Sequence, residues 1–146
     1  MWCCLSTLVK YYMKKEVPTT EDKSFVSEAA KTMIKSSRGF LIVLKEGKPE
    51  GIVTEHDFVE KVIAKELDPS KVIISGIMSS PIITIDPDED LLKASELMKK
   101  HNIRRLPVVK DGIIYGVLTT RDVSQQVREY VDKSVRDIIR WVPLGL

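Results

Sequence analysis

The chain contains one sequence pattern twice, at a fixed offset of 65 positions. Residues 9–64 align without a gap with residues 74–129, and 13 of the 56 aligned pairs are identical, whereas average composition would give about 3 or 4 by chance. Several other pairs exchange one apolar residue for another, such as Val53 and Leu118. Such a repeat predicts two copies of one structural unit, and the fold must accommodate both.

Apolar periodicity predicts the same order of elements in each copy, namely strand, helix, strand, strand and helix. A unit of about 60 residues leaves much of its sheet uncovered. We therefore expect an α+β fold in which two β-α-β-β-α repeats, with small mixed sheets packed against helices, are related by a pseudo-twofold axis. The expected elements are 17–20, 25–36, 40–45, 51–53 and 55–66, then 82–85, 90–101, 105–110, 114–118 and 120–130.

The expected division of the chain follows from the repeat. Residues 1–66 hold an N-terminal segment and the first repeat, and residues 67–131 hold the second repeat. The tail, residues 132–146, has apolar residues at the spacing seen before each repeat. We expect it to form a short helix that packs on the pair, or to meet a partner chain with its apolar end.

Composition narrows the functional classes. Apolar residues make up 43% of the chain and charged residues 30%, and the net charge is +2 with both signs interspersed. That distribution lacks the one-sided basic face of a dedicated nucleic-acid-binding protein, and no apolar run reaches the ~20 residues of a membrane-spanning helix. The only cysteines, Cys3 and Cys4, are adjacent, which disfavours a disulfide or zinc site and is typical of a cytoplasmic protein.

Each copy ends its last strand in a Gly-x-x-Thr-x-x-Asp segment, at residues 51–57 and 116–122. The threonine lies where the strand ends, and the aspartate lies in the first turn of the next helix. One interpretation is a capping box, in which the two side chains satisfy free backbone N–H groups. The other is a ligand site, because a helix N-terminus favours an anionic group. The local sequence is compatible with both.

These segments occur together with two further motifs, Met-Ser-Ser-Pro-Ile-Ile-Thr-Ile at residues 78–85 and His-Asn-Ile-Arg-Arg-Leu-Pro-Val-Val at residues 101–109. In this order and spacing they resemble cystathionine-β-synthase (CBS) domains, and residues 9–131 are similar to a tandem CBS pair, or Bateman module. The resemblance implies a stand-alone regulatory module that binds an adenosine-containing ligand between its repeats, either AMP, ADP, ATP or S-adenosylmethionine. It also implies a homodimer that signals to a separate protein.

The resemblance further implies roles for individual residues. In the family, the aspartate of Thr-x-x-Asp binds the ribose hydroxyls, while the threonine hydroxyl and basic residues meet phosphate. A carboxylate can accept hydrogen bonds from both hydroxyls of a cis-diol, which agrees with that role. The candidate ligand-binding residues are therefore Asp122, Thr119, Arg121, Arg104, Arg105, Asp57, Thr54, His56 and Thr84.

The two copies differ in charge at the phosphate-contacting position of the family. Arg104 and Arg105 occupy it in the second copy, whereas the matching residues of the first copy are the uncharged Gly39 and Phe40. We therefore expect the site at Asp122 to take a phosphorylated ligand. Three alternatives stay open for the site of the first copy: a nucleoside-like ligand, cations borrowed from across the cleft, or no ligand.

The sequence contains no Cys-His or Ser-His-Asp arrangement, no Gly-rich loop after a strand and no cluster of metal ligands. We therefore expect no enzyme activity, cofactor or metal. The alternative function is nucleic-acid binding or assembly on the same scaffold, although acidic residues interrupt the basic ones. A homodimer is expected to bury apolar helix faces such as Phe58 with Val62 and Val123 with Val127.

Overall fold

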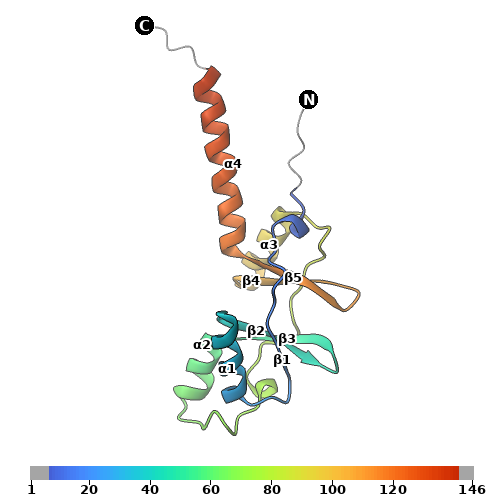
Figure 1. Ribbon diagram of the computed structural model, residues 1–146, viewed down its shortest axis with the longest axis vertical. Coiled ribbons are helices and arrows are strands. Elements are labelled where there is room, and N and C mark those ends of the chain that lie inside the picture. Colours follow the sequence, from blue (N-terminus) through green and yellow to red (C-terminus); the bar gives the residue numbers. More distant parts are fainter. Residues whose placement is uncertain (1–6, 142–146) are drawn as a thin grey trace.

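The computed structural model describes residues 7–141 and shows an α+β protein of two repeats, with a long helix leaving the second repeat (Figure 1). The first repeat contains a three-stranded sheet and the second a two-stranded one. The elements in chain order are η1 (Val9–Tyr11), β1 (Thr19–Glu21), α1 (Val26–Ser36), β2 (Phe40–Lys45), β3 (Lys48–Thr54), α2 (Glu55–Phe58), η2 (Val59–Ile63), η3 (Ile74–Gly76), α3 (Leu91–His101), β4 (Arg105–Lys110), β5 (Ile113–Thr119) and α4 (Thr120–Trp141).

The two hairpins are built alike. β2 pairs with β3 and β4 pairs with β5, both antiparallel, and each pair has an irregularity at the matching place, after Val43 and after Val108. β1 runs parallel to β2 at the edge of the first sheet. In the first repeat α2 continues directly into η2, a single π-helical turn. These elements confirm the expected α+β fold.

One expected strand is missing from the second repeat, and a proline explains it. Residues 82–85 form only an isolated parallel bridge, between Ile85 and Val108. In the first repeat the Ile42 N–H donates to the Pro18 carbonyl oxygen at 3.0 Å and so extends the parallel pairing. Its counterpart in the second repeat is Pro107, which has no N–H to donate. The parallel pairing therefore cannot extend from the bridge toward Ile83.

Each repeat completes its hydrophobic core with the segment that precedes the other repeat. We call residues 7–14 the first leading segment and residues 73–79 the second. Val9, in the first leading segment, is buried in the core of the second repeat. Ile74 and Ile77, in the second leading segment, are buried in the core of the first repeat. The repeats follow one another along the chain, but their cores exchange these segments.

Backbone pairing fixes the exchange. Lys14 and Val117 each donate an N–H to the other's carbonyl oxygen, both at 2.9 Å. Ile52 and Ser79 pair in the same way in the other half, at 3.0 and 2.9 Å. Each leading segment thus lies against the last strand of the opposite hairpin.

Gly51 and Gly116 lie at these two crossings. A Cβ on Gly116 would lie 2.6 Å from the Lys14 carbonyl oxygen and 2.9 Å from the Met13 sulfur. On Gly51 the corresponding distances, to the other leading segment, would be 2.7 and 2.8 Å. Close approach of two backbones therefore requires glycine at both positions, which explains why this residue is identical in the two copies.

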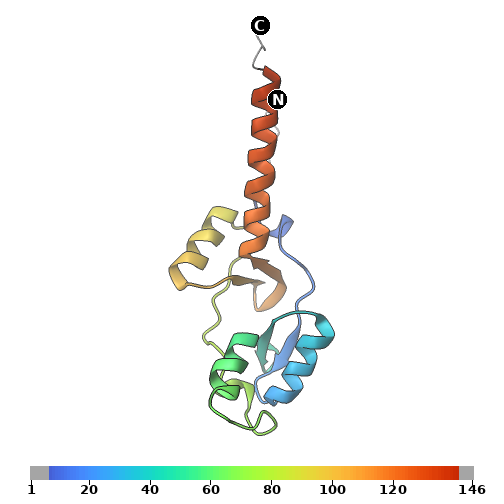
Figure 2. The same ribbon diagram turned by 90° about the vertical axis from the view of Figure 1, so that its left-hand side faces the viewer.

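The tail differs from its expected structure. Residues 132–141 do not form a separate short helix on the pair, because they continue α4 to Trp141. Figures 1 and 2 show this helix running away from both repeats. The physical reason lies in the sequence, since Pro143 is the first helix-breaking residue after Thr120. The alternative in which the tail meets a partner remains a prediction.

One expected dimer surface is also wrong. Phe58 and Val62 are buried within the core of the first repeat, 8% and 0% exposed, so they are not available to a second chain. Val123 packs against the core of the second repeat, whereas Val127 is exposed. Within residues 7–141, no helix has both the length and the apolar content to cross a bilayer.

Asp88 attaches the first leading segment to the second repeat. Its carboxylate accepts hydrogen bonds from the Lys10 ammonium at 2.8 Å and from the Lys110 ammonium at 2.9 Å. These two cations, Lys10 first, lower the pKa of Asp88 to about 2. The same contacts raise the pKa values of both lysines.

Replacing Gly116 by Ala should destabilise the protein by about 1–3 kcal/mol, because the new methyl group overlaps the main chain of the first leading segment. Gly76→Ala is the matched control, since nothing lies within 4 Å of a Cβ there. Urea unfolding curves of both variants measure the difference. Equal midpoints for the two variants would contradict the close crossing.

Replacing Asp88 by Asn should reduce the acid sensitivity of folding. The ordinary pKa of 3.8 is lowered to about 2 in the fold, so the ion pairs contribute fully above pH ~4 and lose their contribution as the pH falls toward ~2. The urea midpoints of wild type and Asp88→Asn should therefore differ at pH 7 and converge near pH 2. Glu89→Gln serves as the control, and a constant difference at all pH values would refute the pairing.

Candidate functional site

Thr54 and Asp57 form a capping box at the start of α2. The Asp57 carboxylate accepts hydrogen bonds from the Thr54 backbone N–H at 2.8 Å and from the Thr54 hydroxyl at 3.0 Å. The Asp57 N–H donates back to the Thr54 hydroxyl oxygen at 3.4 Å. Strand end and helix start are therefore held in one geometry.

The second copy repeats this arrangement with nearly the same distances. The Asp122 carboxylate accepts from the Thr119 N–H at 2.8 Å and from its hydroxyl at 2.7 Å, and the Asp122 N–H donates to that hydroxyl at 3.3 Å. Both aspartates are only 8% exposed. The capping interpretation thus holds in both copies, and in each carboxylate it engages only one oxygen, Oδ2.

The other carboxylate oxygen, Oδ1, meets a lysine, and here the copies differ. Lys61 reaches Asp57 from one turn along the same helix, with 2.8 Å between Nζ and Oδ1. The Lys61 ammonium also donates to the carbonyl oxygen of Ile77, in the second leading segment, at 2.7 Å. Asp122 has Lys14 instead, from the first leading segment, at a looser 3.6 Å.

A cavity of about 520 Å³ opens beside Asp57, between the two repeats. The first repeat supplies the capping pair and the start of α2, while the second supplies the turn from α3 into β4. The lining thus combines a largely buried carboxylate from the first repeat with two arginines from the second. The lining residues are Ile52, Thr54, His56, Asp57, Ser79, Asn102, Ile103, Arg104 and Arg105.

This cavity corrects one sequence-based assignment. Arg104 and Arg105 were expected to equip the site at Asp122, but their side chains line the cavity of Asp57. Arg105 lies opposite Thr119 in the β4–β5 ladder, yet its guanidinium carbon lies 5.3 Å from the centre of the Phe40 ring in the first repeat. Of the three alternatives for the site of the first copy, the structure supports the one in which the second repeat supplies the cations from across the cleft.

The remaining candidate residues are more dispersed. His56 lines the cavity but points its Nε2 toward Glu60 Oε2, 3.4 Å away, in an exposed position. Thr119, Arg121 and Asp122 line neither this cavity nor the second one described below. Thr84 is half-buried just before the Ile85 bridge and also lines neither cavity. Their roles as ligand contacts stay predictions.

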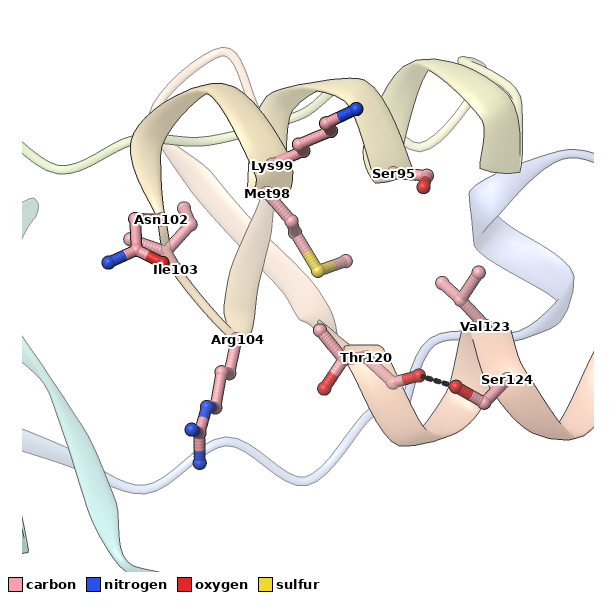
Figure 3. A pocket seen from close by; sticks show the side chains of 9 residues that line it. All are labelled: Ser95, Met98, Lys99, Asn102, Ile103, Arg104, Thr120, Val123 and Ser124. Carbon is pink, nitrogen blue, oxygen red and sulfur yellow. Dashed lines mark hydrogen bonds between the residues drawn. The ribbon is translucent and has the colours of Figure 1, made fainter.

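A second, smaller cavity of about 370 Å³ adjoins the first, between α3 and the start of α4 (Figure 3). Met98 and Val123 point into it, and the Ser124 hydroxyl turns back onto the Thr120 carbonyl oxygen at 2.7 Å. Arg104 borders both cavities, and Figure 3 shows its side chain directed away from Ser95 and Met98. The charged end of Arg104 is thus turned from the apolar groove.

Sequence reasoning missed several residues of the site. Lys61 had a readable signal, since it lies four residues after Asp57 on a helix, a spacing at which opposite charges meet. Lys14 and Ser79 had none, because Lys14 meets Asp122 and Ser79 lines the Asp57 cavity only through the exchange of leading segments. Asn102 and Ile103 belong to the motif at residues 101–109 but carry no charge that would single them out.

Replacing Lys61 by Met should cost about 1–2 kcal/mol, because it leaves a largely buried carboxylate oxygen and the Ile77 carbonyl without their donor. Lys14→Met should cost less, since its contact with Asp122 is longer and its side chain is about half exposed. Lys71→Met, at an exposed pair 4.0 Å long, is the control. Urea unfolding ranks the stability of the three variants. An equal loss of stability in Lys61→Met and Lys71→Met would disprove the contact of Lys61 with both Asp57 and the Ile77 carbonyl.

Comparison with known proteins places these features in a family. A profile of the CBS domain matches residues 9–64 and 74–129, the same segments that align as repeats. The CBS domain-containing protein YhcV of Bacillus subtilis is 30% identical over 132 residues, which cover 89% of this chain and 94% of YhcV. The uncharacterized protein MK0525 of Methanopyrus kandleri is 34% identical over 126 residues, 85% of this chain but only 64% of MK0525.

A solved structure agrees with the sequence relatives. The CBS domain pair of protein MJ0100, in complex with 5′-methylthioadenosine and S-adenosyl-L-methionine, has a TM-score of 0.74 and 34% identity, over 83% of this chain and 99% of that one. Both repeats are therefore matched in sequence, and the pair is matched in fold. The chain belongs to the CBS domain family and contains two CBS domains in tandem.

Proposed function

We propose that this CBS pair is a regulatory module whose ligand is an adenosine-containing molecule, bound in the cavity between Asp57 and the two arginines. The cavity itself is the observation that carries the proposal. The Asp57 carboxylate suits the cis-diol of a ribose, and the guanidinium groups of Arg104 and Arg105 suit a phosphate. A volume of about 520 Å³ is within the ~300–1,000 Å³ typical of small-ligand sites.

The ligand class has independent support from a relative. The similar CBS pair of MJ0100 was solved with two adenosine derivatives, 5′-methylthioadenosine and S-adenosyl-L-methionine. Neither of those molecules carries a phosphate. The phosphorylated members of the class, AMP, ADP and ATP, are the ones that would use Arg104 and Arg105 in this chain.

Binding would require two local changes in side-chain contacts. Oδ1 of Asp57, which faces the Lys61 ammonium at 2.8 Å, would accept a ribose hydroxyl beside or in place of that contact. Arg105 would turn its guanidinium from the Phe40 ring toward the phosphate. Oδ2 of Asp57 stays with Thr54, so the helix start need not change when a ligand enters.

The regulatory consequence follows from the fact that the ligand-binding side chains belong to different repeats. The first repeat supplies the ribose end and the second repeat supplies the phosphate end, so a bound nucleotide would bridge the repeats. A ligand that binds one arrangement of the repeats better than others shifts the population toward it. In this proposal the readout belongs to a separate cytoplasmic protein, and the chain itself carries out no reaction.

Thermal unfolding with AMP, ATP, adenosine, 5′-methylthioadenosine and S-adenosylmethionine tests the proposal. A ligand at 100 times its dissociation constant adds ~2.7 kcal/mol to stability, so a specific shift is measurable. We expect Asp57→Asn to weaken binding of every compound at least tenfold. We expect Arg104→Met with Arg105→Met to weaken AMP and ATP tenfold or more but adenosine by less than about threefold.

Asp122→Asn is the matched control, because it alters the same capping chemistry without touching the cavity. It should leave affinity at this cavity nearly unchanged. Loss of binding in Asp122→Asn but not in Asp57→Asn would place the ligand at the other copy. No shift with any adenosine compound, together with salt-sensitive binding of RNA or DNA, would favour the nucleic-acid alternative instead.

A further inference from the structure

Each capping aspartate has a lysine at its Oδ1 oxygen, but the two lysines come from positions that do not match. In the first repeat the lysine is Lys61, one turn after Asp57 on the same helix, and its counterpart in the second repeat is the uncharged Gln126. In the second repeat the lysine is Lys14, from the first leading segment. Its counterpart in the second leading segment is the uncharged Ser79. The two repeats therefore take this cation from different positions.

Lys14 and Ser79 are equivalent in the structure as well as in the sequence. Lys14 pairs through its backbone with Val117, and Ser79 pairs in the same way with Ile52, with all four hydrogen bonds between 2.9 and 3.0 Å. In each pair the strand residue lies two positions before the capping threonine. The two side chains therefore start from the same place relative to the capping aspartate of their own site.

This difference places one lysine outside the ligand cavity and the other at a cavity position. Ser79 and Asp57 line the cavity of about 520 Å³, whereas Lys61 does not line it. Asp57 thus keeps a side that is open to the cavity while Lys61 balances its charge. Lys14 starts from the place that Ser79 has in the other copy, and its ammonium lies 3.6 Å from Oδ1 of Asp122. In the second repeat the cation therefore lies on the side from which a ligand would approach.

We propose that Lys14 is a specificity-determining residue that excludes a ribose from Asp122, because its ammonium takes the place that the ribose hydroxyls would take at Asp57. The chain then binds one adenosine-containing molecule, in the Asp57 cavity, although it contains two copies of the capping pair. This role of Lys14 rests on the proposed function, since it assumes that a capping aspartate binds the ribose of the ligand.

Two features hold Lys14 in this role. Its backbone is fixed by the paired hydrogen bonds to Val117, so the side chain cannot leave together with its main chain. Thr119 already engages Oδ2 of Asp122, so a ribose would have to compete with Lys14 for Oδ1. A contact between an ammonium and a carboxylate is stronger than a hydrogen bond from a neutral hydroxyl. The competition therefore favours Lys14.

Isothermal titration calorimetry with adenosine tests this role. Adenosine is the probe because it carries the cis-diol and no phosphate, so cations elsewhere in the cleft do not add a phosphate contact to its affinity. The wild type should bind one molecule per chain. Lys14→Ser, which places the residue of the other copy at this position, should bind two. Removing the lysine leaves Oδ1 of a largely buried carboxylate without its donor, and a ribose hydroxyl can replace that donor.

Further variants locate the second molecule and serve as controls. Adding Asp122→Asn to Lys14→Ser should return the chain to one molecule, whose binding at Asp57 also shows that the variant is folded. Lys14→Ala should behave as Lys14→Ser does, whereas Lys14→Arg should bind one molecule because it keeps the cation. Lys15→Ser, at the exposed neighbouring position, should bind one molecule as the wild type does.

The number of adenosine molecules per chain also separates the two proposals. Equal numbers in the wild type and in Lys14→Ser would overturn the role of Lys14, and if that number is zero the proposed function fails as well. If the wild type bound none while Lys14→Ser bound one that Asp122→Asn removed, the role of Lys14 would hold and the assignment of the ligand to Asp57 would fail.

Discussion

Two backbone crossings hold the repeats of this protein together. At each crossing a leading segment pairs in both directions with the last strand of the opposite hairpin, Lys14 with Val117 and Ser79 with Ile52. A glycine in the strand makes the close approach possible, since any Cβ at Gly51 or Gly116 would overlap the crossing chain. Because Val9 and Ile74 complete the opposite cores at 0% exposure, neither core is complete without the segment that precedes the other repeat.

The candidate site is a product of this exchange. Asp57 and Asp122 have nearly the same capping geometry, so the capping boxes alone do not distinguish the copies. The difference arises from what each carboxylate meets across the molecule: Asp57 shares its cavity with Arg104 and Arg105, whereas Asp122 meets Lys14. Pseudo-symmetry in the backbone is thus combined with asymmetry in charge, and the proposal of a phosphorylated ligand for one cavity rests on this combination.

Local features of the fold were predictable from the sequence because they depend on neighbours along the chain. The hairpins, the helix starts and the Thr–Asp pairs all follow from periodicity and from turn or cap chemistry within a few residues. The length of α4 was also readable in principle, since no glycine or proline interrupts residues 121–142. The prediction of a separate short tail helix relied too heavily on an apolar spacing that resembles the spacing in the leading segments.

The placement of the arginines was not predictable in the same way. Aligning two copies pairs each residue with its counterpart, and it leaves open which copy's side chains meet in space. Arg105 illustrates this, because its backbone lies beside Thr119 while its guanidinium lies over Phe40. Likewise, the missing first strand of the second repeat depends on Pro107, which lies more than 20 residues later in the chain, in the strand that would pair with it.

The most direct test of the central claim is a crystal structure of the chain with AMP. The cavity described above predicts electron density for the ribose at the Asp57 carboxylate and for the phosphate between Arg104 and Arg105, so that one molecule contacts both repeats. Density for the nucleotide at Asp122, with the Asp57 cavity empty, would contradict it.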